Sequence, residues 1–218
     1  MTELDPDRRL ALAYVPAARQ LAVAALWRLD AALGAVLATG REPMIGRIRL
    51  AWWRESLERL DEAPPPPEPV LEGVARQLLP AGLSGAELAS MEQGWSRLLE
   101  PGPLSADDIA GYAADRGGRL FLCSARLLGG EGEGVAAAGE AWALVDLARR
   151  STDSGERAAA IEAAAARVLP ELWPVRLRPL GMLASLARRD MQRRGQGWER
   201  PGAPARMLRM LRHRLTGH

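Results

Sequence analysis

Aspartates are the first residues in this chain whose type and spacing could do chemistry. Asp146 and Asp153 are seven residues apart and straddle a predicted helix end, which favours solvated or capping roles. Asp107 and Asp108 open another predicted helix, where negative charge interacts favourably with the helix macrodipole. These four acids therefore predict helix ends rather than a catalytic dyad.

The other reactive side chains lack partners in the sequence. His213 and His218 lie near the C-terminus without clustered ligands, so neither predicts a metal site or a catalytic triad. Cys123 is the single cysteine and lies among Leu and Phe, which favours a small buried hydrophobe over a disulfide. The run GGEGEG at 129–134 lacks the preceding strand that a phosphate loop needs. We expect no cofactor and no bound metal.

Helical periodicity runs through most of the 218 residues, and no stretch alternates with period two. Ser84 and Ser105 each begin a capping-box pattern, and the proline run 63–69 forms a stiff linker. Gly117 and Gly118 inside a predicted helix favour a kink or a close helix crossing. The chain is long enough for one sizeable core. The predicted helices cover about 15–38, 43–61, 84 onward, 105–128, 134–150, 155–168, 177–193 and 203–215. We predict an all-α fold with a single domain, 1–218.

The segment RLAWWRESLERLD, 49–61, places two tryptophans between arginines. The apolar face of its helix comprises Ile45, Ile48, Trp52, Trp53, Leu57 and Leu60. Arg49 falls within that face, and Asp30 falls on the apolar face of the preceding helix. Since the connection is short, the two helices should be antiparallel and bring Asp30 and Arg49 to the same height. We predict a buried ion pair, with Trp53 over the guanidinium and Trp52 in the core. Alternatively, Arg49 reaches solvent and Asp30 lines a polar cavity.

The net charge of +2 is unevenly distributed. Residues 176–218 hold eleven arginines and two acids, a charge of +9, which leaves −7 for the preceding residues. In RMLRMLRHRL the residues Leu208, Leu211 and Leu215 share a face. The basic flank of that helix comprises Arg206, Arg209 and Arg212. This amphipathic pattern fits a helix that docks on the bundle or on an anionic membrane surface.

The sequence start, MTELDPDRR, is charged and lacks an apolar leader region. No apolar run is expected to approach the roughly 20 residues that span a bilayer. We therefore expect a cytoplasmic protein, peripheral at the inner membrane face if the basic helix binds lipid.

Four segments, taken in order, resemble the squalene/phytoene synthase family over about residues 5–150. They are ALWRLDAAL at 25–33, RLAWWRESL at 49–57, the proline-rich break that ends in Pro69-Val70, and YAADRGGRLFLCSARLLG at 112–129. The resemblance implies an all-α helical bundle of the isoprenoid synthase type. Active members of the family condense two prenyl diphosphates head to head.

That reaction depends on two aspartate-rich helical motifs that face each other across the cavity. Carboxylates four residues apart on a helix can hold the Mg²⁺ ions that bind and ionise a diphosphate. The resemblance places the first motif at 31–38, where the chain reads AALGAVLA and has no acid. Asp30 lies alone just before it.

The second motif should fall in DLARRSTDS, which begins at Asp146. By this resemblance Arg150 and Ser154 occupy the positions of the two metal-binding aspartates, and Arg149 matches the arginine usually found in this motif. Asp146 and Asp153 remain without the required spacing. Together with Arg149, they could be a remnant of the second motif.

Three functions are therefore open. The first is a non-catalytic family member that binds an isoprenoid, another lipid or a protein partner. It would be similar to the mitochondrial member that assists assembly of the respiratory NADH dehydrogenase, and its partner could likewise be a respiratory protein. The alternative is an active Mg²⁺-dependent prenyltransferase with rearranged ligands. Nucleic acid is the least expected partner, because the basic residues alternate with Leu and Met at helical spacing.

Overall fold

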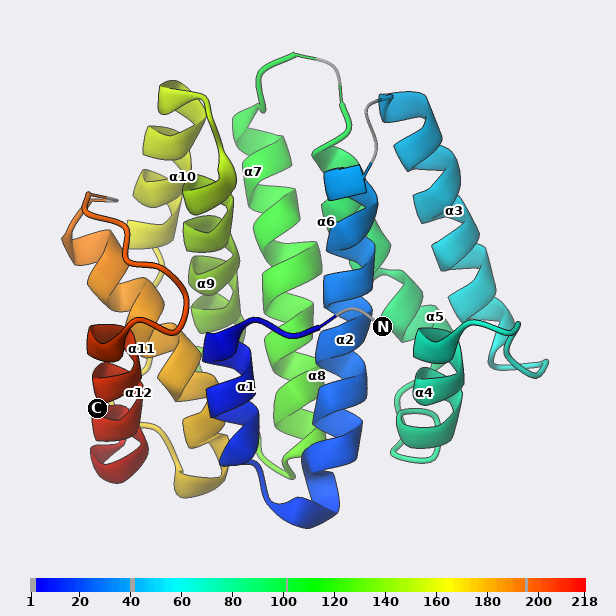
Figure 1. Cartoon of the computed structure of the whole chain (residues 1–218), viewed down its shortest axis with the longest axis horizontal. Coiled ribbons are helices and arrows are strands. Elements are labelled where there is room, and N and C mark those ends of the chain that lie inside the picture. The colour runs from blue at the N-terminus through cyan, green and yellow to red at the C-terminus, as the bar shows by residue number, and fades with distance from the viewer. Residues whose placement is uncertain (1–2, 40–41, 101, 195) are drawn as a thin grey trace.

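Helices form the fold of the chain in the computed structural model (Figure 1), which describes residues 3–39, 42–100, 102–194 and 196–218. Within these ranges there is no strand, as the periodicity predicted. The elements are α1 Pro6–Ala13, α2 Ala17–Thr39, α3 Pro43–Arg59, α4 Pro69–Gln77, α5 Gly85–Ala89, α6 Met91–Arg97, α7 Ala106–Tyr112, a π-helical segment Ala113–Gly118, α8 Arg119–Leu127, α9 Val135–Arg150, α10 Ser154–Ala165, a 3₁₀ turn Val175–Leu177, α11 Arg178–Gln192 and α12 Pro204–Thr216.

Side-chain caps fix several of the helix starts. Ser105 caps α7 with both bonds of the predicted capping box, and Ser84 accepts a bond from the Glu87 amide at the start of α5. Two helices were not predicted. Asp5 caps α1 and Glu68 caps α4, and each helix begins with proline in its first turn. Both are short, with 8 and 9 residues, so their apolar periodicity is hard to recognise.

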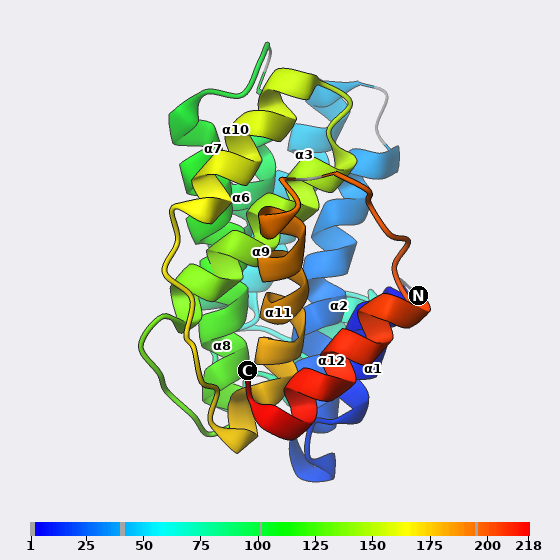
Figure 2. The same ribbon diagram turned by 90° about the vertical axis from the view of Figure 1, so that its left-hand side faces the viewer.

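The long helices lie side by side, with α2, α8 and α9 in the middle of the bundle (Figure 1). Helix α3 forms one edge, while α11 and α12 lie at the opposite edge. Helix α1 packs against α2, α11 and α12, so the two ends of the chain meet on one face (Figure 2). The basic segment 176–218 is thereby part of the same bundle as the rest of the chain.

Helix α3 is oriented differently from the prediction. Leu50, Trp53 and Leu57 face the core, whereas Ile48 is 63% exposed and Trp52 is 44% exposed. The helix packs chiefly on α5 and α6, at the edge of the bundle. Because α3 is apolar on two sides, its pattern did not determine which side is buried.

Helix α2 is long and apolar enough, over Ala17–Ala38, to cross a membrane by length and composition alone. This finding corrects the expectation that no run comes near that length. Buried core helices of soluble proteins meet the same criterion, and 56% of this window is buried. In this structure α2 is one of the central helices of the bundle (Figure 1).

The glycine pair lies in a π-helical segment where two elements approach closely. A methyl group on Gly117 would lie 2.2 Å from the carbonyl oxygen of Gly139 and 2.6 Å from Cβ of Ala143, both in α9. From the other side, a methyl group on Gly94 of α6 would lie 2.8 Å from the Arg116 amide nitrogen. The predicted close crossing is thus confirmed.

Gly117→Ala should lower the free energy of unfolding by about 1–3 kcal/mol, because the added methyl group overpacks the contact with α9. Gly73→Ala is the matched control, since a methyl group there meets nothing within 4 Å. That change in α4 should raise stability by roughly 0.5–1 kcal/mol. Urea unfolding of both variants measures the difference, and equal effects would contradict the close crossing.

Candidate functional site

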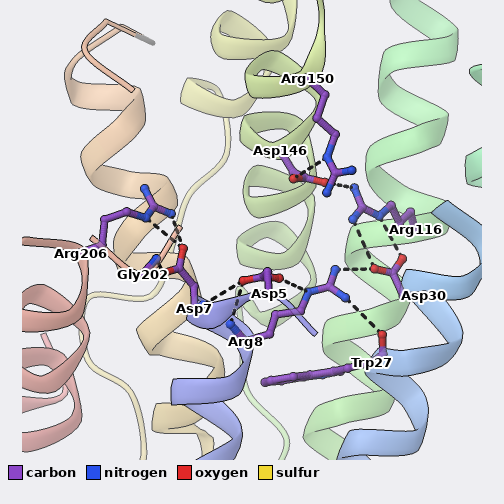
Figure 3. A network of polar contacts seen from close by, with 10 residues as sticks. All are labelled: Asp5, Asp7, Arg8, Trp27, Asp30, Arg116, Asp146, Arg150, Gly202 and Arg206. Atoms are coloured by element: carbon purple, nitrogen blue, oxygen red, sulfur yellow. Dashed lines mark hydrogen bonds and ion pairs between the residues drawn. The ribbon is translucent and has the colours of Figure 1, made fainter. Parts of the chain in front are cut away.

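Helix α2 carries Asp30 into the interior, where the residue has 0% exposure. Its Oδ1 accepts bonds from Nε of Arg116 at 3.0 Å and from Nε1 of Trp95 at 3.2 Å. Its Oδ2 accepts a bond from Nη2 of Arg8 and another from Nη2 of Arg116 at 3.3 Å. The carboxylate is therefore bonded on both oxygens to arginines from α1 and the π-helical segment (Figure 3).

Arg116 continues this network toward α9. Its Nη1 donates to Oδ2 of Asp146 at 2.8 Å, and Oδ1 of Asp146 accepts from Nε of Arg150 at 3.0 Å. One guanidinium thus connects Asp30 of α2 with Asp146 of α9 (Figure 3). The same Nη1 also contacts the hydroxyl group of Tyr112.

Aromatic rings surround the buried guanidinium. The Arg116 Cζ atom lies 4.1 Å from a ring centroid of Trp95, 4.8 Å from Trp142 and 5.3 Å from Tyr112. Arg8 lies over Trp142 at the same 4.8 Å distance. Cation–π attraction and the carboxylates together offset the loss of hydration, so Arg116 is held charged with 1% exposure.

The pKa values follow from these contacts. Burial alone would raise the pKa of Asp30, but the guanidiniums of Arg116 and Arg8 outweigh it and hold that pKa below its ordinary value. Burial also opposes ionisation of Asp146, yet Arg116 and Arg150 lower its pKa from 3.8 to about 2. Both carboxylates are therefore ionised at neutral pH.

A second ionic cluster adjoins the first at the meeting of the chain ends. Nε of Arg206 donates to Oδ2 of Asp7 at 2.9 Å, and its Nη1 donates to Oδ2 of Asp190 at 3.0 Å. Nη1 of Arg149 donates to the same Asp190 oxygen at 3.2 Å. Because Arg206 is buried here, its predicted place on a membrane-facing flank is wrong.

The predicted Asp30–Arg49 pair is also wrong. Arg49 is exposed on α3, whereas Asp30 faces α1, α6 and the π-helical segment. Trp53 is buried beside Leu50, and Trp52 packs edge-on against it with ring centroids 5.3 Å apart. Asp30 is thus buried and neutralised by arginine, as expected, but α1 and the π-helical segment supply the arginines.

The three residues expected as a remnant of the second motif go to separate places. Asp146 joins the Arg116 network, so the prediction that it is solvated or caps a helix is wrong, and Arg149 joins the Asp190 cluster. Asp153 caps α10 by accepting a bond from the Glu156 amide at 2.8 Å, which confirms its capping role.

Sequence reasoning missed the two arginines that neutralise Asp30. Arg8 follows Asp5-Pro6, a pattern typical of a helix start, so a helix could have been predicted there but not its partner. Arg116 directly precedes the glycine pair. The close helix crossing predicted there indicated that residues next to the pair contact another helix, but not which side chain Arg116 binds. The pairing itself depends on residues 22 and 86 positions away from Asp30.

A small cleft lies between the two ionic clusters, with a volume of about 90 Å³. Its charged lining consists of Asp5, Asp7, Asp146, Asp190, Arg8, Arg149, Arg150 and Arg206. Four acids and four arginines balance each other, and the volume matches about three water molecules at roughly 30 Å³ each. Pockets for drug-sized ligands are roughly 300–1,000 Å³, so this cleft is too small to enclose a prenyl chain.

The carboxylates of this region do not fit the magnesium ions that the family's reaction requires. Magnesium needs oxygen ligands with accessible lone pairs, but both oxygens of Asp30 and of Asp146 face guanidiniums. In the ranges that the structure describes, no three His, Cys, Asp or Glu side chains group as metal ligands would.

The all-α bundle defines the class of this protein, and a comparison with protein families identifies it further. The squalene/phytoene synthase family matches residues 1–160, well over half of the chain. The protein belongs to this family, and its fold is the all-α bundle of the isoprenoid synthase type. Comparisons with curated proteins and with solved structures found no match.

Asp30→Asn should lower the free energy of unfolding by about 3–5 kcal/mol, because it leaves Arg8 and Arg116 buried without their shared carboxylate. Glu55→Gln, on the exposed side of α3, serves as the control and should change stability by less than about 0.5 kcal/mol. Urea unfolding at neutral pH measures both. A small effect of Asp30→Asn would mean that the network contributes little.

The pKa of Asp146 predicts a specific pH dependence. Because its pKa is lower in the folded chain, its stabilising contribution is present above pH 3.8 and is lost as pH falls toward about 2. At pH 6 the wild-type chain should exceed Asp146→Asn in unfolding free energy by about 2 kcal/mol, and this difference should shrink below pH 4. Urea unfolding across that range tests it, and parallel profiles for the two proteins would contradict it.

Proposed function

We propose that this chain is a non-catalytic member of the squalene/phytoene synthase family, which acts by binding rather than by turnover. The observation that carries the proposal is the position of Arg116, whose guanidinium bonds to both Asp30 and Asp146. A catalytic member needs such carboxylates for Mg²⁺, and here they are engaged by arginines that belong to the chain.

Electrostatics supports this proposal. Ionisation of a prenyl diphosphate requires positive charge directed at the leaving group. The guanidiniums of Arg8 and Arg116 are directed at carboxylates instead, and Asp30, Asp146 and Asp5 balance the charges of Arg8, Arg116 and Arg150. A diphosphate would have to displace these bonds and face the carboxylates of Asp30 and Asp146.

The packing of the interior bears on the ligand. Trp27, Tyr112, Phe121 and Arg116 are each exposed by only 1% and fill the space between α2, α8 and α9. This packing favours a partner at the surface over an isoprenoid inside the bundle. A role like that of the respiratory assembly member of the family fits such a chain, by analogy at the level of the fold.

The purified chain, incubated with farnesyl or geranylgeranyl diphosphate and Mg²⁺, should release no pyrophosphate above background. The physical reason is that the carboxylates required for the metal are already neutralised. Asp146→Asn is the control, because it removes a carboxylate that any remaining metal site would use, and its background should equal that of the wild type.

Release that requires Mg²⁺ and disappears in Asp146→Asn would reverse the proposal and favour an active prenyltransferase with rearranged ligands. Mg²⁺-dependent release that is equal in both proteins would show turnover that does not use Asp146 and would also contradict the proposal. Farnesyl diphosphate with Mg²⁺ should also leave the melting temperature unchanged, since ligands that bind the folded state raise it.

A further inference from the structure

The outer side of α12 presents apolar residues to solvent. Leu208 is 71% exposed and Leu215 is 78% exposed, two helical turns apart on the same side. The side toward the bundle is formed by Arg206, Met210 and His213, all buried. Helix α12 lies across the outside of the bundle beside α1 and α11 (Figure 2). The exposed leucines therefore form a convex ridge rather than a groove.

The apolar surface extends past the end of α12. Leu172 and Val175 are 59% and 63% exposed in the segment before α11. The Trp173 amide in this segment donates to the carbonyl oxygen of Gly217, just past α12, at 3.0 Å. Nη1 of Arg178, the first residue of α11, donates to the carbonyl oxygen of Leu215 at 2.8 Å.

Positive charge flanks the ridge on the side of α11. Arg212 is exposed. Nε of Arg209 donates to the carbonyl oxygen of Ser185 at 2.8 Å, and Nη2 of Arg188 donates to the carbonyl oxygen of Pro170 at 2.9 Å. Carbonyl groups carry no net charge, so these bonds leave the charges of Arg209 and Arg188 in place. Burial, together with the Arg189 and Arg188 guanidiniums, lowers the pKa of Arg209.

The acids of the basic segment are engaged elsewhere. Asp190 bonds to Arg149 and Arg206, and Glu199 bonds to Arg189 and Arg193. These acids thus neutralise arginines on the inner side of α12 and at the end of α11. Arg209 and Arg212 contribute positive charge to the flank of the outer side of α12.

We propose that the outer face of α12, with Leu208 and Leu215 as apolar anchors and Arg209 and Arg212 as the basic flank, docks on an anionic lipid membrane. The helix is about 20 Å long at 1.5 Å per residue, and a convex amphipathic helix of this kind lies in the plane of the interface. Charge complementarity selects lipids with negative headgroups. This inference does not depend on whether the chain is catalytic.

The test uses the full chain and sedimentation with vesicles of phosphatidylcholine alone or mixed with phosphatidylglycerol. The wild type should bind the anionic vesicles severalfold more tightly than the neutral ones, and added salt should weaken that binding. Leu208→Ser with Leu215→Ser should reduce binding severalfold, and so should Arg212→Gln. Because these side chains are exposed, the melting temperatures of the variants should match the wild type.

Matched controls come from other helices. Leu21→Ser with Leu122→Ser replaces two leucines that are also exposed, on α2 and α8, and Arg54→Gln replaces an exposed arginine of α3. Both controls should bind like the wild type. The proposal is overturned if the wild type does not bind anionic vesicles, as expected for a face that contacts protein, or if the α12 variants bind as tightly as these controls.

Discussion

A carboxylate without access to water must be neutralised by the protein around it, and Asp30 imposes this requirement on the whole bundle. Its two oxygens are bonded to Arg8 and Arg116, which come from elements far apart in the sequence. Helix α1 must therefore pack against α2. The π-helical segment must also place Arg116 between α2 and α9, and the close contact of Gly117 with Gly139 allows α9 to approach it.

The Arg116 guanidinium lies between carboxylates of α2 and α9, close to the two positions where the resemblance to the family's active members places the aspartate-rich motifs. A guanidinium differs from a metal ion in ways that matter for this proposal. It is covalently attached, it cannot be exchanged, and its planar donors engage carboxylates that would otherwise coordinate Mg²⁺. The aromatic rings of Trp95, Trp142 and Tyr112 then occupy space around it. Under the proposed function, the chain keeps the helical bundle of the family, and the side chains in its interior stabilise the fold rather than bind substrate.

The basic C-terminal segment is divided by the fold into two parts with different electrostatic surroundings. Arg206 points inward and links Asp7 with Asp190, which joins the last helix to the first. Arg212, six residues later on the outer side of the helix, faces solvent near the exposed leucines. Two arginines that look equivalent in the sequence thus differ because acids from other elements lie on only one side of α12.

The sequence alone determined the helical class, most helix positions and several helix starts, because these depend on neighbours three or four residues away. Ser105 and its capping box and the close crossing at Gly117 are examples. The family was also recognisable, from short segments in a fixed order. Sequence further indicated that Asp30 is buried and needs an arginine. Only the tertiary structure decided which arginine, because α2 and α3 are apolar on more than one side and local pattern could not select the buried face. Arg8 and Arg116 reach Asp30 through the docking of elements 22 and 86 residues away, which no local pattern encodes.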